Sequence, residues 1–349
     1  MKRILITPQP KICNGPGIFL SRVAKELERR GYSWTARPFH YLGISVPSWD
    51  YVFMMGTPRH IEKILNGSKP LITTMGKPES REECEAVNVK YLPEFEQQEL
   101  LMTRAIMKSP KVVFISKYVK EFWRDIFRLR GLSFPLEDNV KVIYHGLNVD
   151  WFIPSQKPLN TPFVLGSTGS LRGRFRLATL FATSRLLEFD HRLLIVGSMD
   201  SECKEEYEKA MVDPAMAART KYISWVDIKL LPDYYRQMHC LFHPRFGEPF
   251  GIVLAEALAC GVPVVVPAYG GPKEFVAPDC GIAVECERWK WDNEFCRQMA
   301  SAVNEIRNNH ANFAEAARKR AVEYLSIEKT VDEYLDFMEL SRWINRLKG

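Results

Sequence analysis

The segment FHPRFGEPFGIVLAEALACGVPVVVP, residues 242–267, places two carboxylates, Glu248 and Glu256, in surroundings that are mostly apolar and punctuated by glycine. A charged group is costly to bury unless it has a partner, so the two acids need a reason to be there. The pattern predicts a loop followed by a helix that begins near Gly251 and ends near Gly261. Glu248 then precedes this helix, and Glu256 lies on its second turn.

A ligand lying across the start of this helix could contact both carboxylates. The five residues from Gly251 to Glu256 rise roughly 7 to 8 Å along a helix, which is comparable to a diphosphate with its flanking bonds. Free amides around Phe250, Gly251 and Ile252 would face the middle of such a ligand and suit phosphate oxygens. The carboxylates suit sugar hydroxyls. The alternative is an exposed capping Glu248 and a solvent-facing Glu256, which the apolar neighbours of Glu256 disfavour.

Short apolar runs recur on both sides of this segment and alternate with helical patterns. They fall at residues 4–7, 51–56, 71–75, 112–116 and 140–146, and again at 163–169, 192–198, 221–226, 240–244, 262–267 and 281–285. Continuous apolar strands that alternate with helices predict an α/β fold with parallel sheets covered on both faces. Two doubly wound sheets joined near residue 150 are the simplest arrangement, because a single open sheet of more than ~10 strands is uncommon.

Composition sets further bounds on the protein. The 349 residues agree with about two domains, and the 48 basic and 42 acidic residues give a net charge of +6, which is compatible with anionic substrates, acidic lipid or nucleic acid. Eight scattered cysteines without a C-x-x-C pair predict reduced thiols in a cytosolic protein. No run of 18 apolar residues occurs, and the N-terminal apolar run is too short for a signal peptide. We therefore expect a cytoplasmic protein that at most contacts a membrane surface.

The order of motifs in the second half resembles the donor-binding half of the retaining GT-B glycosyltransferases of family 4, the glycosyl transferases group 1. Five elements match in order: ISWVD, the E-x7-E pair Glu248 and Glu256, A-x-G-x-P-V-V at 259–265, G-G-x-x-E at Gly270, Gly271 and Glu274, and GIAVE. The resemblance implies a GT-B fold, in which two Rossmann-like domains face each other across a cleft. Residues 1–147 would form the acceptor-side domain, with the last helix, about 330–349, packing back on it. Residues 148–329 would bind a nucleotide-sugar donor.

The resemblance also implies roles for the residues of this half. Glu248 would bind hydroxyls of the donor sugar, and Glu256 would bind the ribose of the nucleotide. The amides of Phe250, Gly251 and Ile252 would lie near the sugar and the distal phosphate.

A basic pair that the family carries on the first loop and helix of the donor domain falls in GSTGSLRGRFRLATLF, where Gly169 is a further candidate for donor binding. Ser170 stands where the family commonly has Arg. Arg172 and Arg174 are therefore the candidates for holding the diphosphate, with Arg176 in reserve, although a solvated basic face is the alternative for each of them.

The first half resembles the family less closely. NGPGIFLSRVAKEL resembles the Gly-rich loop after the first strand, where Gly15 and Gly17 would allow close backbone approach to the donor phosphates. Many members carry a sugar-contacting His after the fourth strand, whereas this sequence has ITTMGKPES there. His40, His60 and His145 lie in no matching motif, so none is given an acceptor-side role.

A basic and aromatic helix is expected at 117–130. Its basic residues recur at helical spacing: Lys117, Lys120, Arg124 and Arg128. Such a helix could rest on anionic lipid, although an ordinary packed helix with a solvated basic face is favoured.

The function that the resemblance implies is retaining transfer of a hexose-type sugar from a nucleotide diphosphate sugar to a glycan, lipid-linked or small-molecule acceptor. Front-face attack, with the leaving diphosphate taking the proton, would need neither metal nor cofactor, because helix amides and arginines neutralise the leaving group. A uridine donor is favoured by its frequency in the family, and no nucleic-acid partner is expected. The alternatives are a nucleotide-sugar 2-epimerase of related fold and a non-catalytic nucleotide-sugar binding protein.

Overall fold

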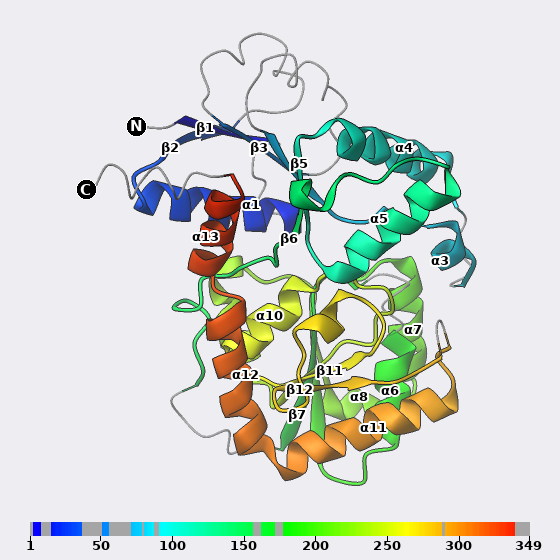
Figure 1. Cartoon of the computed structure of the whole chain (residues 1–349). Coiled ribbons are helices and arrows are strands. Elements are labelled where there is room, and N and C mark those ends of the chain that lie inside the picture. The colour runs from blue at the N-terminus through cyan, green and yellow to red at the C-terminus, as the bar shows by residue number, and fades with distance from the viewer. Residues whose placement is uncertain are drawn as a thin grey trace. The chain divides into compact units, whose positions relative to one another are not determined.

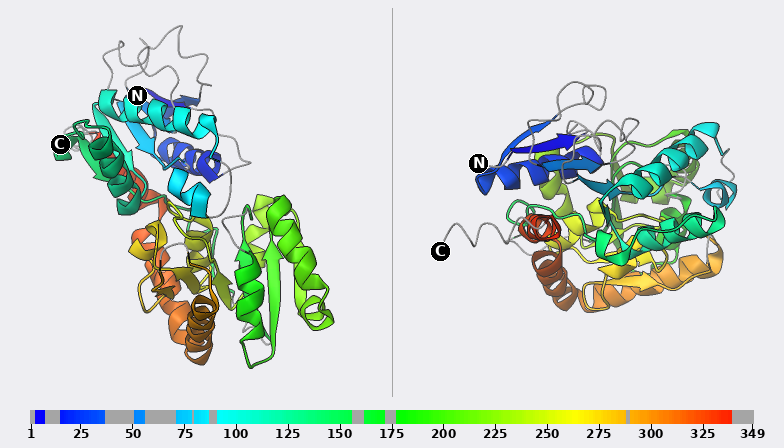
Figure 2. Two further views of the ribbon diagram at one scale, coloured as in Figure 1. Left: turned by 90° about the vertical axis from the view of Figure 1, so that its right-hand side faces the viewer. Right: turned by 45° about the horizontal axis from the view of Figure 1, so that its top comes forward.

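The computed structural model describes residues 3–7, 15–36, 51–55, 71–78, 80–86, 91–155, 162–171, 177–287 and 290–338. The chain forms two compact units (Figure 1). One comprises Met1–Leu147 and Leu325–Gly349, and the other comprises Asn148–Tyr324. Each unit contains a parallel sheet, and helices cover the sheets (Figure 2), so the expected α/β architecture with parallel sheets is confirmed.

The sheet of the first unit has the strand order β2-β1-β3-β4-β5-β6. Its strands are β1 (Arg3–Thr7), β2 (Ser33–Ala36), β3 (Tyr51–Met55), β4 (Leu71–Met75), β5 (Lys111–Phe114) and β6 (Val140–Val142). The helices of this unit are α1 (Gly15–Arg29), α3 (Arg81–Ala86), α4 (Pro93–Lys108), α5 (Lys117–Leu129) and α13 (Ile327–Phe337). The apolar runs predicted as strands thus pair in parallel. In β4 and β5, for example, Ile72 lies opposite Lys111.

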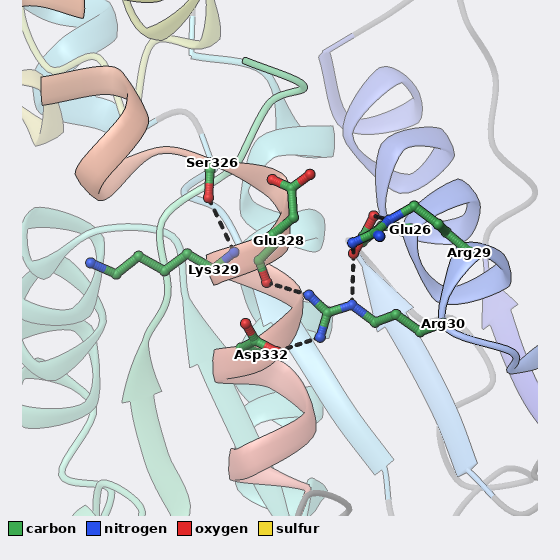
Figure 3. Close-up of polar contacts among 7 residues, drawn as sticks. All are labelled: Glu26, Arg29, Arg30, Ser326, Glu328, Lys329 and Asp332. Atoms are coloured by element: carbon green, nitrogen blue, oxygen red, sulfur yellow. Dashed lines mark hydrogen bonds and ion pairs between the residues drawn. The ribbon is translucent and has the colours of Figure 1, made fainter. Parts of the chain in front are cut away.

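Helix α13 is the last described helix, and it packs beside α1, more than 290 residues earlier in the chain (Figure 3). Arg30, just after α1, donates to Glu26 at 2.6 Å and to the carbonyl oxygen of Glu328 at 2.8 Å, and it pairs with Asp332. Arg29 contacts the same Glu26 carboxylate at 2.7 Å. Burial raises the pKa of Glu26, but the hydrogen bonds from the two arginines outweigh it and leave the pKa below its usual value. Arg30 therefore links a buried carboxylate on α1 to α13.

The chain passes from the first unit to the second and back at neighbouring positions. Leu147 pairs with Ser326 in a parallel bridge, its amide donating to Leu325 and its carbonyl accepting from Ile327, each at 2.9 Å. A Cβ on Gly146 would lie 2.5 Å from Oγ1 of Thr330, so the two segments meet closely only because residue 146 is glycine. The second unit is thus inserted between two hydrogen-bonded segments of the first.

Helix α5 is capped by Ser116, whose side chain accepts from the amide of Val119, and it buries Val119, Trp123 and Phe127 on one face. Most of its basic side chains have acidic partners: Lys120 with Glu137 at 2.7 Å, Arg124 with Glu121 at 3.0 Å and also with Glu137, and Arg128 with Asp125 at 2.9 Å. Contact with anionic lipid stays a prediction, and these ion pairs reduce the positive charge available for it. Within the described residues, no helix is long and apolar enough to cross a membrane.

The sheet of the second unit has the strand order β12-β11-β10-β7-β8-β9. Its strands are β7 (Phe163–Thr168), β8 (His191–Val196), β9 (Thr220–Ile223), β10 (Cys240–Phe242), β11 (Val264–Pro267) and β12 (Gly281–Val284). Its helices are α6 (Leu177–Arg185), α7 (Ser201–Met211), α8 (Pro214–Arg219), α9 (Leu231–Tyr235), α10 (Ile252–Ala259), α11 (Asn293–Asn308) and α12 (His310–Tyr324). The chain builds outward from β7 through β8 to β9, and then crosses back to place β10 on the other side of β7. Ligands of doubly wound sheets bind at the carboxyl ends of strands where the order reverses in this way. A ligand site is therefore expected at the carboxyl ends of β7 and β10.

The link between α1 and α13 gives a stability prediction. Arg30→Ala should lower the free energy of unfolding by roughly 1.5–3 kcal/mol, because Glu26 stays buried and loses a charged hydrogen bond. Arg29→Ala is the comparison variant. Arg29 is 64% exposed and its hydrogen bonds to Glu26 stay within the α1 segment, so solvent screens the contact and the loss should be smaller than for Arg30→Ala. Urea denaturation of both variants measures the difference, and equal losses would contradict the role given to Arg30.

Candidate functional site

The loop after β10 carries Glu248 and is fixed through its backbone by the G-G-x-x-E segment. Glu248 and Gly270 form a parallel bridge, and the amide of Gly271 donates to the carbonyl of Glu248 at 2.8 Å. Gly270 has a φ of 130°, and a Cβ there would lie 2.8 Å from the carbonyl oxygen of Glu248 and 3.0 Å from its nitrogen. Only glycine permits this approach. The two motifs, separate in the sequence, are one structural element.

The carboxylate of Glu248 is mostly buried and lies beside two basic side chains. Its Oε2 is 3.2 Å from Nη1 of Arg245 and 3.7 Å from Nε2 of His243, and its side chain is 14% exposed. Burial raises the pKa of Glu248. Arg245, His243 and the backbone amide of Phe250 together have the opposite and larger effect, so the pKa falls to about 2. Glu248 is therefore an ionised acceptor near neutral pH, and not the exposed cap of the alternative interpretation.

Helix α10 begins at Ile252, one residue after the predicted start. Gly251, with a φ of 86°, turns the chain into the helix, and Gly261, with a φ of 69°, follows its end. Phe250 is buried against the ring of Phe275, with 5.0 Å between ring centroids. Residues 250–252 thus form the N-terminus of a buried helix at the carboxyl edge of the sheet, where amides favour anions.

Glu256 is buried, with 2% exposure, and receives a hydrogen bond from a tyrosine that the sequence did not single out. The hydroxyl of Tyr235, on α9, donates to Oε2 of Glu256 at 2.9 Å. The same hydroxyl lies 3.2 Å from Oγ1 of Thr168, at the end of β7. Burial, and next the charge of Glu256, raise the pKa of Tyr235 well above its usual value, so Tyr235 remains a hydrogen-bond donor. Glu256 is not a solvent-facing helix position.

A hollow of about 190 Å³ lies beside these groups, at the carboxyl ends of β7, β8 and β9. Thr168, Gly169, Ser224, Trp225, Tyr235 and Val253 are among the residues that line it. Trp225 is 77% exposed, which is unusual for the largest apolar side chain. The hollow thus combines polar groups with an exposed aromatic side chain beside the N-terminus of α10, a lining that suits a ligand with both polar and apolar parts.

Of the other predicted site residues, some lie within the described ranges and some lie outside them. Gly169 directly follows β7, has a φ of 117° and lines the hollow. Arg172 and Arg174, and Arg176 in reserve, lie outside the described residues. Gly15 and Gly17 form the first turn of α1 in the first unit, where the preceding residues 8–14 are not described.

Of the three histidines in the first unit, His145 is the one that the structure describes. His40 and His60 lie outside the described residues. His145 is buried and stacked on Phe19 with 3.9 Å between ring centroids, and burial, with a smaller effect of Arg22, lowers its pKa to about 3. His145 is therefore a neutral packing residue. In the described part of the chain, no group of three or more His, Cys, Asp or Glu side chains is placed to hold a metal ion.

Residues 151–320 match the family model described as Glycosyl transferases group 1. This segment belongs to that family. The match covers the second unit almost entirely, and it includes Glu248, Glu256, Gly270 and Tyr235.

Curated relatives are similar over part of their length. The chain is 23% identical to a probable sucrose-phosphate synthase of Thermosipho melanesiensis over 214 residues, which cover 58% of this chain and 48% of that protein. It is 28% identical to a D-inositol 3-phosphate glycosyltransferase of Xylanimonas cellulosilytica over 186 residues, which cover 48% of this chain and 43% of that protein. The chain spans about half the length of the curated relatives it matches.

Solved structures match the chain over nearly its full length. A sucrose-phosphate synthase from Thermosynechococcus elongatus has a TM-score of 0.72 at 17% identity, covering 99% of this chain and 100% of that one. HepE of Anabaena, in complex with UDP, has a TM-score of 0.74 at 15% identity, covering 97% and 100%. HepE in complex with UDP-glucose has a TM-score of 0.70 at 16% identity, covering 96% and 99%. The predicted GT-B fold class is confirmed by these likenesses.

The hydrogen bond from Tyr235 to Glu256 gives a second prediction. Tyr235→Phe should lower the free energy of unfolding by about 1–3 kcal/mol, because a buried carboxylate loses its donor. Tyr234→Phe, one residue earlier on the same helix, is the matched control and should change little. In a Glu256→Gln background the cost of Tyr235→Phe should shrink, and a fully additive double-mutant cycle would show that the two side chains do not depend on each other.

Proposed function

We propose that this protein transfers a sugar, with retention of configuration, from a nucleotide diphosphate sugar bound in its second unit. The observation that carries this proposal is the placement of Glu248 and Glu256 on either side of the N-terminus of α10, where the strand order reverses. Two ionisable acceptors around a set of amides match a ligand with hydroxyls at both ends and phosphates between them. Membership of the glycosyl transferases group 1 family supports the same assignment.

Each group has a distinct task in this proposal. Glu256 accepts from the ribose hydroxyls, with Tyr235 holding its other side. Glu248 accepts from hydroxyls of the donor sugar, while the amides around Gly251 face the phosphates. Arg172 and Arg174 are proposed to neutralise the diphosphate, on the strength of the family motif. Gly15 and Gly17 are proposed to approach the phosphates from the first unit.

The hollow beside Trp225 suits the nucleobase. Its volume of about 190 Å³ can hold a single ring system, and it adjoins Tyr235, which contacts the proposed ribose ligand Glu256. A flat exposed indole offers a stacking surface for a base. Uridine is the favoured base, and the UDP and UDP-glucose complexes of HepE, a structural neighbour, support that choice.

The chemistry proposed is front-face attack by the acceptor, with the leaving diphosphate taking its proton. Amides at the start of α10 and the basic pair stabilise the charge that develops on the leaving group, so the scheme asks for no metal ion. The acceptor is a glycan, a lipid-linked sugar or a small molecule. Glu248 serves here to orient the donor sugar and forms no covalent bond.

The division of roles between the carboxylates is tested by calorimetry. Glu256→Ala should weaken binding of UDP and of UDP-glucose alike, by roughly tenfold or more, because both ligands carry the ribose. Glu248→Ala should spare UDP and reduce turnover sharply. Glu294→Ala, on the surface of α11, is the control for loss of an acid. Equal losses of UDP and UDP-glucose binding in Glu248→Ala would reject this division.

The base pocket makes a separate prediction. Trp225→Ala should weaken UDP binding by about 1–3 kcal/mol, while leaving pyrophosphate binding unchanged, because stacking concerns the base alone. Trp225→Phe should retain most of the affinity. If Trp225→Ala weakens pyrophosphate as much as UDP, the indole does not stack on the base.

A further inference from the structure

Arg245 lies in the loop between β10 and α10, three residues before Glu248, and its guanidinium reaches back to that carboxylate. Nη1 of Arg245 is 3.2 Å from Oε2 of Glu248, and the arginine side chain is 27% exposed. The buried Nε–H of Arg245 has no hydrogen-bond partner among the described residues. The guanidinium therefore approaches Glu248 through Nη1 and not through Nε, and its contact falls on Oε2 of the carboxylate.

His243 approaches the same oxygen from the end of β10. Its Nε2 is 3.7 Å from Oε2 of Glu248, which is too long for a hydrogen bond. The closest contacts of both basic groups thus fall on Oε2. Of the ion pairs within the described ranges, these are the two that involve Glu248.

Arg245 favours the charged state of Glu248. A carboxylate with 14% exposure would tend toward its neutral form through desolvation, which is the largest single influence on its pKa. Arg245 is the largest influence in the opposite direction, ahead of His243 and the amide of Phe250, and the resulting pKa is about 2. An ionised carboxylate only accepts hydrogen bonds, whereas a protonated one also donates.

We propose that Arg245 is a positioning residue for donor-sugar recognition: it holds Oε2 of Glu248 and supplies the countercharge to the carboxylate, which then accepts from a sugar hydroxyl. This inference rests on the proposed function of Glu248. It assigns to the second unit a sugar site in which a carboxylate accepts from sugar hydroxyls and is held in place by a cation from the same loop.

The test follows donor KM and kcat of the full chain with UDP-glucose against pH, for wild type, Arg245→Gln and Arg245→Lys. In wild type, donor KM should not rise on the acid side, because Glu248 stays ionised. In Arg245→Gln the folded-state pKa of Glu248 should move up toward or above its ordinary 4.5, so donor KM should rise as pH falls, by about tenfold or more. Arg245→Lys should restore the flat profile. UDP affinity should be unchanged in all three.

Two results would overturn the proposal. A pH-independent loss in Arg245→Gln together with weaker UDP binding would mean that the guanidinium contacts the donor phosphates directly. Unchanged KM at every pH would mean that Arg245 plays no part. Arg297→Gln, which removes a 60% exposed arginine also paired with an acid three residues away, controls for loss of charge.

Glu248→Gln separates this inference from the proposed function. It should be impaired at every pH without an acid-side change, and adding Arg245→Gln should impair it no further. If Glu248→Gln turns over normally, the proposed role of Glu248 is wrong. If Glu248→Gln is impaired and Arg245→Gln behaves as wild type, only the role of Arg245 is wrong.

Discussion

The backbone contact between Glu248 and the Gly270–Gly271 pair is the constraint on which the candidate site depends. It ties the loop after β10 to the loop after β11 through a 2.8 Å hydrogen bond, at a separation that a side chain at position 270 would prevent. With the loop fixed at that point, Gly251 can turn the chain into α10, and the helix presents its amides beside the Glu248 carboxylate. Glycine here supplies rigidity, because its missing side chain allows two backbones to bond.

Much of the fold and part of the site could be predicted from the sequence because their signals are local. The apolar runs were long enough to indicate parallel strands, and the glycines around IVLAEALA located the start of α10 to within one residue and its end to within two. The groups that complete the site could not be found in this way. Tyr235 lies 21 residues before Glu256 on a separate helix, and nothing in LPDYYRQ distinguishes its hydroxyl from that of Tyr234. Only the path of the chain brings it to the carboxylate.

Helix α5 also shows that contacts between distant segments cannot be found from a local sequence pattern. Its basic residues recur at helical spacing, which is compatible with a surface for anionic lipid, although a solvated basic face was favoured. Glu137, the acid that pairs with Lys120 and Arg124, lies 17 and 13 residues further along the chain, beyond the window in which helical periodicity is judged. Net charge along one helix is thus a poor guide to the field that the helix presents, because neighbouring segments supply counter-charges.

The insertion of residues 148–324 between Leu147 and Leu325 sets an order on biosynthesis. The first sheet is translated early, but α13 leaves the ribosome only after the whole second unit. Asp332 and Tyr334 of α13 contact Arg30 and Phe53 of the first unit, so the packing of that unit is incomplete until then. The second unit is continuous in sequence and can fold as soon as it emerges from the ribosome. The first unit cannot complete its fold until α13 is made, and until then the face of α1 that packs against α13 stays exposed. Early folding of the second unit would bring its two neighbouring ends together and replace a long, entropically costly loop by a short connection.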